Sequence, residues 1–229
     1  GRIGELRRLP LCGFVFKSKS PSSGMRGVKV YDEAGGLLSR AGVGLFARSF
    51  METFPDLPVE DELGLRNRAV AENFVERVFM MHHWRAAEAE GFTPDRLAEF
   101  HARHGLVLMS HSSSGFRMLD GMAAASTEAF PERLARYRAG MMRVMALRTT
   151  PRKHARVLHR ISGFLGNSLK PEEKAELASA IDDYRLGLAP RTVPVNLLLR
   201  RLGAHLHRCP GCRCYLSPRP WSPMLDDRA

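Results

Sequence analysis

The sequence predicts a mainly α fold, an all-α bundle of about six helices preceded by a small α/β segment. From Glu60 onward apolar residues recur at helical spacing with few β-branched runs, whereas the residues before it hold short strand-like runs and glycine turns. We therefore expect an α/β segment over residues 1–60, an all-α region over residues 61–207, and an irregular tail rich in Cys and Pro over residues 208–229.

The first segment has the pattern of a mixed α/β fold. Residues 12–16 form an apolar run and residues 28–31 alternate apolar and basic side chains, as short strands do. The glycine pair at 35–36 predicts a turn, and residues 45–53 predict a short helix after a glycine-rich stretch. Prolines within residues 55–58 end this pattern.

Glycine and proline clusters divide the second region into helices. The breaks lie at residues 91–94, 112–115, 130–131, 149–151, 166–171 and 188–190. The strongest predicted helix spans residues 170–185, with Ser168 near its N-cap and Pro171 in its first turn. Three residues of this helix recur at helical spacing and should face the core: Leu177, Ile181 and Tyr184.

Composition and cysteine usage indicate a soluble, cytoplasmic protein without a membrane partner. The chain is 44% hydrophobic, enough to bury a core, and no run approaches the roughly 18 apolar residues of a membrane helix. The apolar stretch at residues 9–16 is followed by lysines and hydroxyl residues, unlike a cleavage site. Three of the 4 cysteines lie in the last 21 residues, which is atypical of a secreted disulfide framework.

Basic residues are in excess and clustered. The chain has 35 Lys and Arg against 24 Asp and Glu, a net charge of +11. Nine of the basic residues fall within 133–160, where Glu132 is the nearest acid. Such a block indicates a polyanionic partner, because neutralising phosphates releases counterions. The alternative is a solvated surface in a protein that uses Arg as its default polar residue.

Three histidines form a stripe on one predicted helix. His101, His104 and His111 lie on the same side of a continuous helix, next to Arg103. Such a stripe can bind zinc, contact RNA, or pack inside the protein. Zinc is the least favoured, because no Glu stands at the spacing of a helical zinc hydrolase motif. RNA contact by these four residues and structural packing stay open.

A second basic cluster opens the helix that follows Pro151. Its members are Arg152, Lys153, His154, Arg156, His159 and Arg160. Residues 152, 156, 159 and 160 fall on one helical face, so this is the preferred phosphate-binding element. The alternative is an ordinary solvated face.

The C-terminal cysteines are weak metal candidates. His205 and His207 precede Cys209, Cys212 and Cys214, and a Cys-x-x-Cys spacing lets two thiolates share one metal. A structural zinc site usually combines two pairs of ligands separated by a loop. This stretch lacks that arrangement. We expect no bound metal here and treat these as cysteines of an exposed tail.

Residues 17–24, Lys-Ser-Lys-Ser-Pro-Ser-Ser-Gly, follow the first predicted strand. They resemble the C-terminal motif of the thiouracil desulfidase family, Lys-Ser-x-Ser-Pro-Ser-Cys-Gly, whose cysteine helps hold a four-iron four-sulfur cluster. Ser23 stands in place of that cysteine, and Cys12 matches none of the family's ligand positions. The resemblance implies that Ser20 and Ser22 contact substrate. We expect residues 1–60 to be the truncated C-terminal part of such a domain, with an incomplete cluster site and no cofactor of its own.

The helical region carries a series of motifs at residues 72–79, 97–104, 108–111, 153–159, 184–188 and 193–195. Through these motifs it resembles the YbgA family, a domain of unknown function, over about residues 73–206. In many bacteria this domain follows a desulfidase domain, and the fused proteins are associated with removing sulfur from 4-thiouridine in tRNA. The resemblance implies that the helical domain holds the RNA.

These observations favour an RNA-binding helical module, with tRNA as the expected partner, attached to a desulfidase-related segment. One alternative is an active iron–sulfur-dependent desulfidase completed by additional N-terminal sequence. Another is a helical protein-interaction domain whose positive charge is incidental. The alternatives differ in iron content and in the salt dependence of binding.

Overall fold

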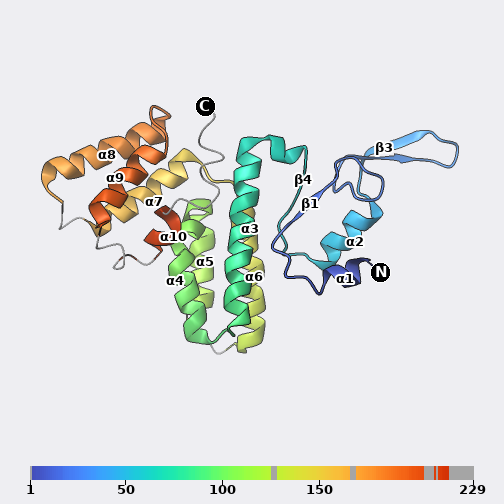
Figure 1. Cartoon of the computed structure of the whole chain (residues 1–229), viewed down its shortest axis with the longest axis horizontal. Helices are drawn as coiled ribbons and strands as arrows, with labels where there is room; N and C mark the ends of the chain where they lie inside the picture. Colours follow the sequence, from blue (N-terminus) through green and yellow to red (C-terminus); the bar gives the residue numbers. More distant parts are fainter. Residues whose placement is uncertain (1, 125–127, 166–168, 204–208, 210, 217–229) are drawn as a thin grey trace. The chain divides into compact units, whose positions relative to one another are not determined.

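The computed structural model describes residues 2–124, 128–165, 169–203, 209 and 211–216. The chain divides into two compact units, Gly1–Phe92 and Thr93–Ala229. Within the described residues the fold is mainly α with a few short strands near the N-terminus, which confirms the predicted fold class (Figure 1). No described helix combines the length and apolar character needed to cross a bilayer.

The first unit contains short strands and two substantial helices. Its elements in order are α1 (Arg2–Leu6), β1 (Phe14–Phe16), β2 (Val28–Tyr31), β3 (Leu37–Gly42), α2 (Leu45–Thr53), β4 (Val59–Asp61), the 3-10 helix η1 (Gly64–Arg66) and α3 (Arg68–Ala89). β1 pairs with β4 in parallel, with Phe14 opposite Val59. β2 and β3 form an antiparallel hairpin whose turn contains Gly35 at φ +84°. The predicted strand at 28–31, turn and short helix at 45–53 are therefore confirmed.

A phenylalanine cluster forms the core of this unit. Phe46, Phe50 and Phe54 recur every four residues at α2, so their rings lie on one face of the helix. The Phe50 ring lies 4.4 Å from that of Phe14 and 5.4 Å from that of Phe16, measured between centroids. Phe16 and Phe50 are fully buried. Burial of these rings holds α2 against the end of β1.

Helix α3 belongs to the first compact unit. A Cβ added at Gly13 would meet the side chains of Val78 and Phe74, at 2.6 and 3.4 Å, so α3 packs closely against the chain entering β1. The boundary expected near residue 60 follows a change in sequence pattern, whereas the compact units divide at Phe92.

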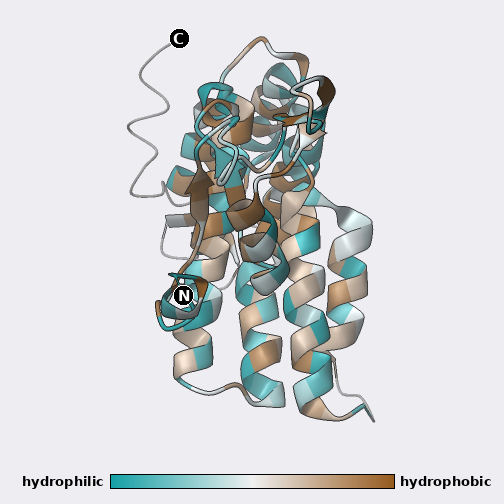
Figure 2. Cartoon of the chain, turned by 90° about the vertical axis from the view of Figure 1, so that its right-hand side faces the viewer, coloured by the Kyte–Doolittle hydropathy of each residue, from teal (hydrophilic) through white to brown (hydrophobic). Residues whose placement is uncertain are grey.

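The second unit is a helical assembly. Its described helices are α4 (Pro94–His111), α5 (Ser113–Ala123), α6 (Phe130–Ala146), α7 (Pro151–Phe164), α8 (Pro171–Leu186), α9 (Thr192–Leu202) and the short α10 (Cys212–Leu216). α4 packs against α5, α6, α7 and α10, while α7 also packs against α8 and α9. Hydrophilic and hydrophobic residues are interspersed along the helices (Figure 2).

Local sequence determines where these helices begin and end. Thr93 and Thr150 each precede a proline, and their hydroxyls accept from the backbone N–H three residues on, at 3.2 and 3.3 Å. The Ser112 hydroxyl caps the N-terminus of α5 in the same way. α8 ends at Gly187, whose φ of +78° suits glycine.

The helix predicted over residues 170–185 is α8, which differs from the expected bounds by one residue at each end. Its Leu177 and Ile181 are buried as expected. Ser168, the expected N-cap, lies outside the described residues, and Glu173 instead accepts from the Lys170 backbone N–H at 3.0 Å. In the described part of region 61–207 there are seven α-helices, α3 to α9, against about six expected, because the chain forms α9 after the last break.

Candidate nucleic-acid interface

The serine-rich loop, residues 17–24, folds against the start of α2. Ser20 Oγ accepts from the Ser23 N–H at 3.2 Å and lies 3.4 Å from Ser22 Oγ. The Ser22 carbonyl accepts from the backbone N–H of Phe46 at 2.9 Å, and a Cβ at Gly44 would overlap this carbonyl. The loop thus occupies the α2 N-terminus with its own backbone. Ser20 and Ser22 lie together, and their contact with substrate stays a prediction.

The residues of this loop do not fit an iron–sulfur cluster. At the family's cysteine position Ser23 offers a hydroxyl, a poor substitute for a soft thiolate. Cys12 lies ahead of β1, where burial raises the pKa of its thiol although Arg85 opposes the effect. A protonated thiol is a weak ligand. Within the described residues, no three His, Cys, Asp or Glu side chains come together as a metal site.

The three histidines of α4 lie inside the second unit. His101, His104 and His111 are all buried, with at most 4% of their surface exposed. His104 Nδ1 lies 2.9 Å from the Phe100 carbonyl oxygen, and His111 Nδ1 lies 2.6 Å from that of Leu147, so both imidazoles donate to backbone. The three histidines have the predicted helical spacing. They pack inside the protein, which was one of the alternatives. His104 and His111 are therefore removed from the candidate RNA surface, whereas His101 also lines a hollow beside it, and Arg103 is exposed.

Helix α7 separates its six candidate residues into two groups. Arg152, Arg156, His159 and Arg160 are exposed. Lys153 points inward, where its ammonium donates to the His111 carbonyl at 2.7 Å and to the Arg148 carbonyl at 2.6 Å. It therefore neutralises the carbonyl end of α4 and contacts the chain that follows α6.

His154 is buried and belongs to the interior. Arg191 Nη1 lies 3.3 Å from its Nε2, and since arginine only donates, Nε2 is the acceptor. The ring proton is then on Nδ1, which donates to Tyr215 Oη at 2.8 Å. Lys153 and His154 are corrections to the expected RNA-binding set, because both side chains are committed to internal contacts.

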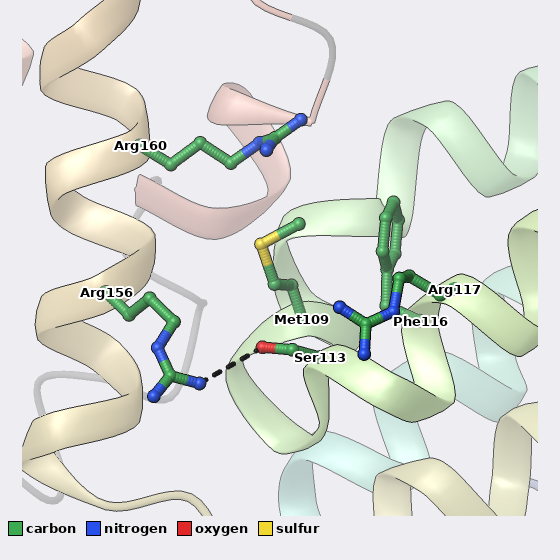
Figure 3. Close-up of a pocket in the computed structure, with 6 residues that line it drawn as sticks. All are labelled: Met109, Ser113, Phe116, Arg117, Arg156 and Arg160. Carbon is green, nitrogen blue, oxygen red and sulfur yellow. Dashed lines mark hydrogen bonds between the residues drawn. The ribbon is translucent and has the colours of Figure 1, made fainter.

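An arginine-lined groove lies among α4, α5 and α7. One hollow, about 360 Å³, is lined by Met109, Ser113, Phe116, Arg117, Arg156 and Arg160. Arg156 and Arg160 come from α7 and Arg117 from α5, and Figure 3 shows Arg156 and Arg117 reaching toward each other around Ser113. Arg156 Nη1 lies 3.4 Å from Ser113 Oγ. In the described part of the chain no carboxylate forms an ion pair with these three arginines, which leaves their charge available to an anion.

A second hollow, about 420 Å³, continues the groove. It shares Met109, Phe116 and Arg160 with the first and extends to His101, Asp120 and Phe164. The His101 ring stacks on Phe116 with 5.0 Å between centroids, and its Nδ1 lies 2.9 Å from Tyr137 Oη. Asp120 Oδ1 lies 3.3 Å from His101 Nε2, outside hydrogen-bonding alignment.

Burial determines the protonation of His101 and Tyr137. It lowers the pKa of His101, although the Asp120 carboxylate opposes this, and it raises the pKa of the Tyr137 phenol. A neutral imidazole and a protonated phenol result. With Tyr137 as the donor to Nδ1, the ring proton lies on Nε2, 3.3 Å from Asp120 Oδ1.

The C-terminal cysteines take a different arrangement from a metal site. Cys209 and Cys212 form a disulfide, with Cα atoms 5.4 Å apart, and Cys214, which is partly exposed, lies outside this disulfide. Gly211 between them has φ +79° and fits against the carbonyls of Ala102 and Arg103 on α4. His205 and His207 lie outside the described residues.

The fold and groove define a helical domain with an arginine-lined groove that follows a small α/β segment. Residues 106–220 match the DUF1722 family, described as proteins of unknown function, and because this is half of the chain, the protein belongs to that family. Residues 2–62 are similar to the 2-thiouracil desulfurase family. Both findings confirm the resemblances seen in the sequence.

One relative is the uncharacterized protein YbgA of Escherichia coli (strain K12). It is 27% identical over 121 residues, which cover 52% of this chain and 72% of YbgA. No solved structure matches the chain.

Proposed function

We propose that the helical unit binds RNA, with tRNA as its partner, through the arginine-lined groove. The observation that carries the proposal is the convergence of Arg117, Arg156 and Arg160 on one hollow without carboxylate partners among the described residues. Guanidinium groups bind phosphate oxygens in bidentate geometry. The net charge of +11 adds a long-range attraction for a polyanion.

The composition of the groove distinguishes it from a simple charged face. Phe116 and Met109 lie beside the arginines, so apolar surface is available next to the phosphate-binding groups. Recognition of unpaired RNA combines such surfaces for bases with cations for the backbone. The similarity to the YbgA and desulfurase families, from which we expect a tRNA partner, supports the same proposal.

The desulfidase alternative receives no support from the serine-rich loop. Iron-dependent removal of sulfur needs thiolate ligands, and the loop provides the hydroxyls of Ser20, Ser22 and Ser23. We propose that the first unit contributes ligand contacts through Ser20 and Ser22 rather than a cluster.

The test compares two double variants of the full chain for binding to fluorescently labelled tRNA by anisotropy. Arg156→Ala with Arg160→Ala removes two charges from the groove. Arg136→Ala with Arg185→Ala removes two exposed charges already paired with Glu128 and Asp182. We expect the groove variant to lose about tenfold or more in affinity and the control to lose less than about threefold. Equal losses would show that only net charge matters.

A further inference from the structure

The groove has two chemically different ends that are continuous. Met109, Phe116 and Arg160 line both hollows, so a ligand can extend from one into the other. One end carries Arg117 and Arg156, and the other reaches Asp120. Volumes of about 360 and 420 Å³ lie in the range of small-molecule sites. The groove is therefore large enough to take a ligand with one anionic and one uncharged part.

The second hollow offers flat, apolar surface. Phe164, at the end of α7, is 54% exposed, and Phe116 presents a ring that is fixed by its stack on His101. Ala102, Gly105 and Leu106 of α4 add small and aliphatic surface. Aromatic rings that are exposed or half-buried beside cations are stacking positions for nucleobases.

A polar pair stands at this end of the groove. His101 Nε2 is buried, has no hydrogen-bond partner among the described residues, and belongs to a side chain that lines the hollow. The side chain of Asp120, which is 65% exposed, provides carboxylate oxygens 3.3 Å away. The imidazole N–H of His101 is a hydrogen-bond donor, and the carboxylate of Asp120 is a hydrogen-bond acceptor. Nucleobases carry N–H donors on the Watson–Crick edge, and the exposed Asp120 carboxylate can accept from one of them.

We infer that the groove seats one unstacked nucleotide of the bound RNA, with its phosphate at the arginines and its base between Phe164 and the His101–Asp120 pair. This inference rests on the proposed RNA binding and specifies what the groove recognises. The apolar surface accounts for stacking, and the exposed Asp120 carboxylate beside His101 supplies a polar contact for the base edge. The arginines and the stacking surface together offset the cost of unstacking one base.

The first test is calorimetric titration of the full chain with uridine and adenosine 5′-monophosphates, ribose 5-phosphate and inorganic phosphate. We expect at least one mononucleotide to bind about tenfold or more tighter than ribose 5-phosphate. Equal affinities, or no mononucleotide binding at millimolar concentration, would overturn the inference. The tRNA experiment with the arginine variants is independent of this outcome, so failure of the base site and failure of RNA binding are distinguishable.

The second test uses Asp120→Ala and Phe164→Ala, both at exposed positions, with folding checked by circular dichroism. Asp120→Ala should weaken mononucleotide binding about tenfold, because a charged acceptor is removed, while inorganic phosphate binds no more weakly, because a negative charge has been removed. Phe164→Ala should weaken binding of the mononucleotide and leave binding of inorganic phosphate unchanged. Parallel changes in phosphate and nucleotide binding would contradict a base site.

A competition experiment tests whether the nucleotide that binds in the groove is part of the bound RNA. A saturating mononucleotide should displace labelled tRNA from the full chain, and ribose 5-phosphate at the same concentration should displace less. If tRNA stays bound while the mononucleotide is bound, the groove is not the place where a nucleotide of the RNA sits.

Discussion

The Lys153 ammonium lies 2.7 Å from the carbonyl oxygen of His111, across 42 residues of sequence. The same nitrogen lies 2.6 Å from the Arg148 carbonyl oxygen, so one cation holds the end of α4 and the chain that follows α6. Lys153 is therefore a structural residue in a run of basic residues that otherwise points outward.

Lys153→Met should destabilise the protein by about 1–3 kcal/mol, since it removes two charge-assisted hydrogen bonds and a favourable interaction with helix ends. Guanidinium-induced unfolding measures the change. Arg152→Ala, an exposed neighbour on the same helix, is the control and should change stability by less than about 0.5 kcal/mol. A variant of Lys153 that unfolds at the wild-type midpoint would show that its hydrogen bonds are not stabilising.

Gly105→Ala should reduce binding to the groove. A Cβ at this position would lie 2.9 Å from Phe116 Cε2, so the ring must move, and it lines both hollows. We expect tRNA affinity to fall at least about threefold. Gly121→Ala is the control, because its Cβ would meet nothing within 4 Å, and it should bind normally while gaining roughly 0.5–1 kcal/mol from helix propensity. Normal tRNA binding by Gly105→Ala would show that Phe116 is not part of the binding site.

Stability should depend on the titration of His101. Its pKa in the folded protein lies below the ordinary value of 6.5, because burial penalises the imidazolium. The unfolded chain therefore takes up the proton first as pH falls, so this contribution to stability is complete above about pH 6.5 and is lost below it. Unfolding midpoints measured from about pH 7.5 to 5 should decline in this window, and less so in His101→Gln. Identical slopes in both proteins would exclude His101 as the source.

Anaerobic reconstitution with iron and sulfide should give this chain no four-iron cluster, since hydroxyls occupy the serine-rich loop and burial raises the pKa of Cys12. Visible absorbance and iron content measure the result. Ser23→Cys alone should not restore a cluster, because one thiolate is insufficient. Stoichiometric iron and sulfide in the unaltered chain would revive the desulfidase alternative.

Elements governed by local sequence were predictable. The helix at 45–53 matches α2, and the helix predicted from Pro171 and the spacing of its apolar residues is α8. Both depend on caps, breakers and spacing within one segment. The tertiary environment of a correctly placed helix was not predictable, because it depends on which other helices cover it.

The candidate site shows this limit residue by residue. The spacing of 152, 156, 159 and 160 predicted one exposed face, and the structure agrees, whereas Lys153 and His154 fall about 100° and 200° around the helix from Arg152. Helical angle separates His154 from the exposed face, but Arg160 falls about 80° from Arg152, next to Lys153. Lys153 is distinguished instead by its hydrogen bonds to the His111 and Arg148 carbonyls, which depend on tertiary packing. Arg117 was missed, because it is a single arginine outside the basic runs and joins the groove only through packing of α4, α5 and α7.

The most direct measurement is the salt dependence of tRNA affinity for the full chain and for Arg117→Ala with Arg156→Ala and Arg160→Ala. Removing one arginine that binds a phosphate should lower the slope of log affinity against log salt by about 1. We predict a clearly shallower slope for the triple variant, by as much as about 3, together with weaker binding at low salt. An unchanged slope and affinity would contradict the claim that this groove binds RNA.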